Sequence, residues 1–163
     1  KQIDTQLLLA QAYFGSQDYL LTVETLDLIP LNQSLTEGQL NQMLALYYKS
    51  GSYPQSETIL KRLIQQHPET FKYWRQLTSI YLARNKRRSA LDQLALARQK
   101  KLVFEPHDIQ LLASLYAANQ AAQKGAKILE KAIEQGEIEN NEENNKRVFH
   151  RKQACAKRSH DDD

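Results

Sequence analysis

The sequence predicts an all-α fold, a right-handed α-solenoid of about four helix pairs, on three observations. Apolar residues recur at offsets of three and four, as in Trp74, Leu77 and Tyr81, which is the period of a helix and not of a strand. Proline and glycine, with four and five copies in 163 residues, punctuate the chain too rarely for many short strands. A pattern of apolar and small residues also returns about every 34 residues, the length of two short helices and their turns.

Eight segments, each long enough for about three helical turns, lie between the turn signals of the chain. Several segment ends carry their own signals. Ser34 and Glu37 have the spacing of a capping box at a helix start. Pro54 suits a first helical turn, where its missing N–H would be unpaired in any case. His67 precedes Pro68 and is therefore biased out of the helical region, which predicts the end of a helix there.

Three tracks of residues keep the repeat period, at steps of 34, 34 and 35 residues. The tracks consist of Tyr13, Tyr47, Tyr81 and Tyr116; of Leu26, Leu60, Leu94 and Leu129; and of Leu9, Met43, Leu77 and Leu112. The additional residue falls in the loop before Pro106, where an insertion costs little. Because the same face recurs in every unit, we interpret Trp74 and the tyrosines as core residues between helix pairs and not as a ligand site.

The third unit resembles the tetratricopeptide repeat (TPR) family, whose pattern begins W-x2-L-G-x2-Y. Trp74, Leu77 and Tyr81 fit this pattern, while Thr78 replaces its glycine. The small and apolar positions of the second helix follow at Ala90, Leu94 and Ala97. The resemblance covers roughly residues 3 to 136, so we expect a helical repeat domain over residues 1–136. It implies a concave groove that binds a peptide or a partner protein.

We expect this groove to be lined by one stripe of the first helix in each pair. The predicted partner-binding residues are Asn41, Tyr48, Lys72, Arg75, Ser79, Leu82, Gln110 and Ser114. The stripe combines amides, two cations and exposed aromatic rings, which suits a peptide backbone and acidic side chains; a merely solvated surface is the alternative. A family variant that clamps a terminal carboxylate would need lysine, asparagine and arginine where Leu7, Gln11 and Gln76 stand, and is therefore not expected.

The residues that catalysis or metal binding requires are missing from the pattern, so the predicted protein is not an enzyme and has no cofactor and no metal site. Cys155 is the only cysteine, which excludes an intramolecular disulfide and a cysteine-based zinc site. There is no glycine-rich phosphate loop. No run approaches the roughly 20 apolar residues that span a bilayer, so we expect no membrane insertion.

The charge pattern leaves one alternative function open. The net charge of +3 is only mildly basic. The basic residues that gather in the third unit are Arg84, Lys86, Arg87, Arg88, Arg98, Lys100 and Lys101. Helical repeat proteins of a related kind read RNA with one base per repeat. Here the basic residues belong to one helix and its turns and do not recur in every unit, so RNA binding stays the alternative to a protein-binding scaffold.

Composition changes abruptly after the fourth unit. Residues 137–163 are polar and charged, and none of their apolar residues lies on the three tracks. Such composition favours disorder. We therefore expect residues 137–163 to be a disordered tail, or a truncated or artefactual end.

A second, narrower resemblance concerns the second and third units. The stretches "ALYYKSGSYPQSETILKRLIQQHPE" and "FKYWRQLTSIYL" are similar to the TPR proteins that accompany bacterial TonB energy-transduction systems. This resemblance implies an exported protein with TonB-system components among its partners. The expected compartment is the periplasm, with the cytoplasm as the alternative.

Overall fold

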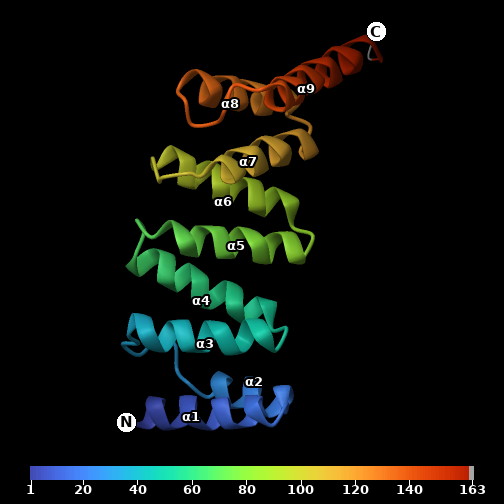
Figure 1. Cartoon of the computed structure of the whole chain (residues 1–163). Helices are drawn as coiled ribbons and strands as arrows, with labels where there is room; N and C mark the ends of the chain where they lie inside the picture. Colours follow the sequence, from blue (N-terminus) through green and yellow to red (C-terminus); the bar gives the residue numbers. More distant parts are fainter. Residues whose placement is uncertain (162–163) are drawn as a thin grey trace. The chain divides into compact units, whose positions relative to one another are not determined.

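The computed structural model describes residues 1–161 and folds this part of the chain into nine α-helices with no strand (Figure 1). It forms two compact units, which are described separately: the first comprises Lys1–Ile80 and the second begins at Tyr81. The helices are α1 (Gln2–Gly15), α2 (Tyr19–Asp27), α3 (Glu37–Lys49), α4 (Tyr53–Gln66), α5 (Phe71–Ala83), α6 (Arg87–Gln99), α7 (Pro106–Ala118), α8 (Ala122–Glu134) and α9 (Glu142–Asp161).

The predicted fold class, an all-α solenoid of TPR-like helix pairs, is confirmed. In the first unit, α1 packs on α2 and α3 packs on α4, and α3 in turn contacts both α1 and α2. In the second unit, α6 packs on α7, α7 on α8, and α8 on α9. Within each unit, these contacts join helices that are close in sequence, which is how a solenoid builds a core from local contacts.

The turn inside each helix pair has one backbone shape, repeated four times. In the first pair, the Asp18 N–H donates to the Tyr13 carbonyl at 2.9 Å and the Gln17 N–H donates to the Phe14 carbonyl at 2.9 Å. These two bonds define a Schellman motif, whose second-last residue adopts a left-handed conformation. The left-handed residues of the four turns are Gln17, Gly51, Asn85 and Gln120, with φ of 62°, 74°, 56° and 64°. They follow the repeat period, although only one of them is glycine.

One of the three predicted tracks lies entirely in the core. Leu26, Leu60, Leu94 and Leu129 are at most 1% exposed. A neighbouring track of small residues lets paired helices approach closely, and it consists of Thr22, Ser56, Ala90 and Gly125. Gly125 is the tightest of these positions, since an added Cβ would lie 2.5 Å from the Ala113 carbonyl oxygen. Trp74 is 2% exposed and its indole N–H donates to the Pro68 carbonyl, which confirms it as a core residue.

The other two tracks hold only in part. Met43, Leu77 and Leu112 are each 1% exposed, but Leu9 is 46% exposed and the prediction that it is a core residue is wrong. Among the tyrosines, Tyr47 and Tyr81 are buried, while Tyr13 and Tyr116 are half-buried.

The predicted helix ends are correct at two positions and shifted at a third. Pro54 lies in the first turn of α4, and α4 ends at Gln66, directly before His67 and Pro68. The capping box of α3 is made by Thr36 and Gln39 and not by Ser34 and Glu37: the Gln39 N–H donates to the Thr36 hydroxyl, and the Thr36 N–H donates to the Gln39 side chain. Both residue pairs have the spacing of a capping box. The structure uses Thr36 and Gln39, and this helix start leaves Leu35 and Leu40 buried on either side of the cap.

Residues 142–161 differ from the expected disordered tail, because they form α9, which packs against α8. Residues 162 and 163 of the predicted tail lie outside the described residues. Asn141 caps the helix by accepting the Asn144 N–H at 3.0 Å, and the aliphatic side chains of Ile138 and Val148 are 4% and 8% exposed. Composition alone predicted too little structure for this segment. Two buried apolar residues and one cap are enough to hold α9 as a helix, because α8 supplies the surface against which it packs.

A bidentate ion pair joins the loop after α8 to the C-terminal end of α6. The Arg98 guanidinium donates two bonds to the Glu137 carboxylate, at 2.7 and 2.6 Å, and lies 5.3 Å from the centre of the Phe104 ring. The Arg98 hydrogen bonds lower the pKa of Glu137 below the ordinary carboxyl value of 4.5, against the opposing effect of burial. Both side chains are 28% exposed, so solvent screens the pair in part.

This bridge predicts a pH-dependent stability. Because the pKa of Glu137 is lowered in the folded state, the stabilisation is present above the ordinary carboxyl pKa and is lost as pH falls through the folded value. We expect Glu137→Gln to lower the free energy of unfolding by about 1 kcal/mol or less at pH 7. In urea titrations over a series of pH values, the difference from the parent protein should shrink progressively as pH falls below the ordinary carboxyl pKa of 4.5. A difference that persists in acid would show that the glutamine disturbs packing instead.

Candidate functional site

A groove lies between α3 and α5 in the first unit, with a volume of about 570 Å³. Its floor is apolar: Leu44, Leu60 and Ile80 are 6%, 0% and 1% exposed. Its walls carry polar and charged side chains from the solvent-facing stripe of both helices. The lining residues are Asn41, Leu44, Ala45, Tyr48, Lys49, Leu60, Lys72, Arg75, Gln76, Ser79 and Ile80.

The groove is electropositive. Lys49, Lys72 and Arg75 line it, and no aspartate or glutamate is among its lining residues. The Arg75 guanidinium lies 4.7 Å from the centre of the Phe71 ring, which fixes its position over an apolar surface. The Lys49 ammonium lies 6.0 Å from the centre of the Phe14 ring. Three cations around an apolar floor favour an anionic guest that also offers some apolar contact.

Two amides on the groove wall differ in what they offer a ligand. The Asn41 amide N–H groups are already used: they donate to the Tyr73 hydroxyl at 2.9 Å and to the Glu37 carbonyl at 3.0 Å. The Tyr73 hydroxyl donates in turn to the Glu37 carboxylate, and burial raises the pKa of Tyr73. The Gln76 side-chain oxygen, in contrast, is buried without a hydrogen-bond partner.

The structure brings together five of the eight predicted binding residues. Asn41, Tyr48, Lys72, Arg75 and Ser79 all line the groove. Lys49 and Gln76 belong to it as well but were not predicted. The sequence did contain a signal for both, since they stand next to predicted stripe residues along the same helices, at positions that a helix surface row places beside Ala45 and Lys72.

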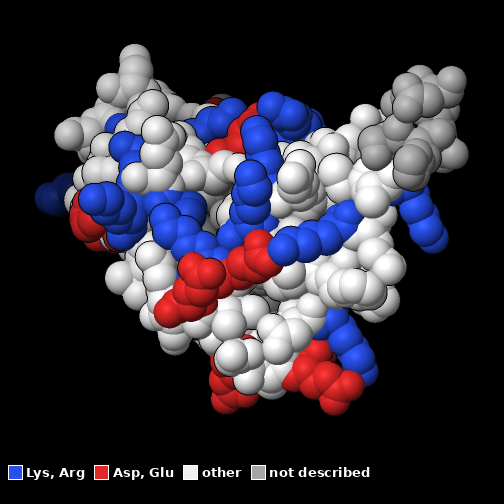
Figure 2. Space-filling model, turned by 90° about the horizontal axis from the view of Figure 1, so that it is seen from above, with Lys and Arg blue, Asp and Glu red and all other residues white. Residues whose placement is uncertain are grey.

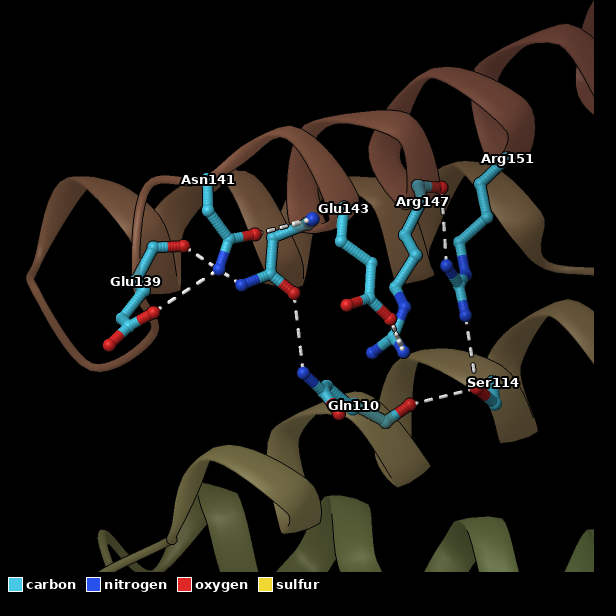
Figure 3. Close-up of polar contacts among 8 residues, drawn as sticks. Gln110, Ser114, Glu139, Asn141, Glu143, Arg147 and Arg151 are labelled. Atoms are coloured by element: carbon cyan, nitrogen blue, oxygen red, sulfur yellow. Dashed lines mark hydrogen bonds and ion pairs between the residues drawn. The ribbon is translucent and has the colours of Figure 1, made fainter.

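The other three predicted residues lie in the second unit. Leu82 is 36% exposed. The Gln110 amide donates to the Asn144 side chain at 3.3 Å, and the Arg151 guanidinium donates to the Ser114 hydroxyl at 3.0 Å (Figure 3). Gln110 and Ser114 are thus hydrogen-bonded to α9. This contact was not predictable from the composition of residues 137–163, which favours disorder and not a helix.

The Gln110 contact is similar to the Asn41 contact. Asn41 and Gln110 are the fifth residues of α3 and α7, while Tyr73 and Asn144 are the third residues of α5 and α9. In each unit, an amide of one helix therefore bonds the third residue of the second helix after it. The two contacts differ in register, because they join residues that are 32 and 34 apart in the sequence.

Charges on the second unit are mixed. Ion pairs join Lys152 to Glu130 on α8, and Arg147 to Glu143 within α9. Figure 2 shows carboxylates beside lysine and arginine side chains on the face seen from above, and not an uninterrupted basic surface. Arg88 is paired with Asp92 at 3.2 Å in α6. Such a surface lacks the continuous positive track that phosphate backbones require.

Residues 1–161 show neither of two further kinds of site. Among the side chains that the structure describes, which end at residue 157, no group of three or more histidine, cysteine, aspartate or glutamate residues is arranged to hold a metal ion. None of the helices in the same range is both long and apolar enough to cross a membrane.

Comparison with known proteins supports the fold and not a particular function. No family model and no curated protein matches the chain. Among solved structures, it is similar to MamA from Desulfovibrio magneticus RS-1, with a TM-score of 0.53 and 16% identity over 82% of this chain and 75% of that one. It is similar to MamA of MSR-1, with a TM-score of 0.56 and 16% identity over 94% and 84% of the two chains.

A third similar solved structure consists of TPR-like repeats. This chain is similar to the nearly identical TPR-like repeats of a kinesin light chain from Podosopora anserina, with a TM-score of 0.53. Identity is 17%, over 98% of this chain and 89% of that one. The chain is thus a helical repeat protein of the TPR type in its fold.

Proposed function

We propose that the protein is a non-catalytic scaffold that binds an acidic segment of a partner protein in the groove between α3 and α5. The observation that carries this proposal is the groove itself, in which Lys49, Lys72 and Arg75 surround an apolar floor without an acidic lining residue. The guest's carboxylates would pair with Lys72 and Arg75, and its apolar side chains would contact the floor. Charge-assisted bonds of this kind contribute about 1.5–3 kcal/mol each.

A charge-reversal pair tests the proposal. Peptides selected from a random phage-displayed library on the purified protein should be enriched in aspartate and glutamate. The double variant Lys72→Glu/Arg75→Glu should bind a selected peptide at least about tenfold more weakly, because two favourable contacts become repulsive. Titration calorimetry measures the affinities, and circular dichroism should show unchanged helix content.

The matched control is Lys124→Glu/Lys127→Glu. These two lysines are exposed on α8, have the same spacing of three residues, and change the net charge equally. The control should bind the selected peptide as the parent protein does. Equal weakening in both double variants would mean that net charge alone governs binding, and full binding by Lys72→Glu/Arg75→Glu would place the site elsewhere.

Two narrower parts of the function rest on the sequence alone. The TonB-system partners and the periplasmic location come from the resemblance of the second and third units. A pull-down from envelope extracts that returns TonB-type components would support them, and one that returns RNA or ribosomal proteins would favour the RNA-binding alternative. RNA binding should in addition weaken steeply with added salt.

A further inference from the structure

Two aromatic pairs in the first unit form a surface that we call the aromatic ledge, made of Phe14, Tyr19, Tyr48 and Tyr53. Phe14 and Tyr19 have ring centres 5.5 Å apart at an interplanar angle of 54°. Tyr48 and Tyr53 repeat the arrangement at 5.8 Å and 58°. Corresponding rings are 34 residues apart, so the ledge is a repeated feature of the first two helix pairs.

The turns do not need these rings. Asn85 and Gln120 lie in turns of the same backbone shape as those of the first two pairs. The positions that correspond to the aromatic pairs there are Leu82 with Arg87, and Ala117 with Ala122. Tyr19 and Tyr48 are moreover 46% and 51% exposed, so half of each ring contributes nothing to the core. Exposed aromatic rings that folding does not require are typical of protein-binding surfaces.

The aromatic ledge is continuous with the groove. Tyr48 belongs to both, and the Lys49 side chain, which lines the groove, reaches to 6.0 Å from the Phe14 ring centre. A ligand in the groove that extends toward α1 would therefore pass from the cations of α5 over the Tyr48 pair and then over the Phe14 pair.

The spacing of these features suits one ligand conformation. α1 packs against α3, and the axes of packed helices lie about 8–10 Å apart, so we expect the two aromatic pairs at about this separation. The Asn41–Tyr73 bond joins α3 to α5 beyond them. A polyproline II helix has three residues per turn and a rise of about 3.1 Å, so equivalent side chains return every 9.3 Å or so. An extended strand returns to the same side about every 6.7 Å, which does not match.

We propose that the aromatic ledge and the groove together bind a polyproline II segment with prolines three residues apart and an acidic residue three positions beyond them. The two prolines would lie on the two aromatic pairs, and the acidic residue would meet Lys72 and Arg75. Aromatic-lined surfaces bind such segments at low entropic cost, because the ligand is already extended in solution. This inference rests on the proposed function, since it uses the same groove, and it adds the conformation and sequence pattern of the partner.

Three synthetic peptides test the pattern. The first, Glu-Ser-Thr-Pro-Ser-Thr-Pro-Ser-Thr-Glu, has the proposed spacing in both chain directions. The second has alanine for both prolines, and the third has glutamine for both glutamates. With a fluorescent label, anisotropy titrations should show that each changed peptide binds at least about tenfold more weakly than the first.

Protein variants separate this inference from the proposed function. Tyr19→Ala removes a ring of the ledge that does not line the groove, and it should weaken the first peptide at least about tenfold without affecting the proline-free peptide. Phe149→Ala, a matched loss of a 56% exposed ring on α9, should change neither affinity.

Each other outcome decides between the two proposals. If the proline-free peptide binds as tightly as the first and Tyr19→Ala has no effect, while Lys72→Glu/Arg75→Glu abolishes binding, the polyproline inference is wrong and the proposed function stands. If the first peptide binds Lys72→Glu/Arg75→Glu at full strength, both the groove assignment and the inference are wrong. If none of the three peptides binds at about 1 mM while a library-selected acidic peptide does bind, the polyproline inference is wrong and the proposed function stands.

Discussion

Replacing Trp74 by alanine should lower the free energy of unfolding by about 3–5 kcal/mol, the largest effect that we expect of any single substitution in the first unit. Trp74 is 2% exposed, so its removal leaves a large cavity, and the Pro68 carbonyl loses its hydrogen-bond donor. Urea denaturation followed by far-ultraviolet circular dichroism measures the change. Fluorescence cannot serve here, because Trp74 is the only tryptophan.

Trp74→Phe is the control for this prediction. Phenylalanine keeps most of the buried ring and removes the bond to Pro68, so it should cost clearly less than alanine. If Trp74→Ala proves nearly neutral, the indole does not support the core, and a role in ligand binding would have to be considered for it instead.

Gly125→Ala should destabilise the second unit by about 2 kcal/mol or more, although alanine is the better helix former by about 1 kcal/mol. The added Cβ would lie 2.5 Å from the Ala113 carbonyl oxygen and 3.3 Å from its carbonyl carbon, both backbone atoms of α7. Backbone atoms cannot rotate away as a side chain would, so α7 and α8 must separate. Thermal and urea denaturation should both report the loss.

Gly15→Ala is the matched control for the second prediction. Gly15 is the last residue of α1, and a Cβ at this position would have no atom within 4 Å. The change should therefore alter stability by no more than about 0.5 kcal/mol. A Gly125→Ala protein that is more stable than its parent would show that α7 and α8 can move apart at no cost.

How much the sequence could predict depended on what each residue contacts. The leucine tracks and Trp74 were predictable, because a position inside a repeat has the same neighbours in every unit. The exposure of Leu9 was not predictable, because the repeat pattern does not show which side chains pack around each position. The Thr36–Gln39 box escaped detection for a related reason: Ser34 and Glu37 match the same pattern, and only the packing of Leu35 and Leu40 distinguishes the two.

The candidate groove was predictable in its outline and not in its detail. Helical periodicity is sufficient to place Lys72, Arg75 and Ser79 on one stripe. It does not show which polar atoms are already satisfied by the protein. Asn41 was expected to bind a ligand backbone, yet its N–H groups are used between α3 and α5. Gln76, in contrast, has an unpartnered buried oxygen that no spacing rule reveals.

The four Schellman turns bear on how such a repeat diverges. Their geometry is held by main-chain bonds, from the N–H groups of Asp18, Ser52, Lys86 and Ala121 to the carbonyls of the four track tyrosines. Main-chain bonds are indifferent to side-chain identity, so glutamine, glycine and asparagine are all accepted at the left-handed position. Substitutions can therefore replace the characteristic residues of the repeat without changing the spacing between its turns. In this architecture, the number of residues between turns is constrained more strongly than the residue types are.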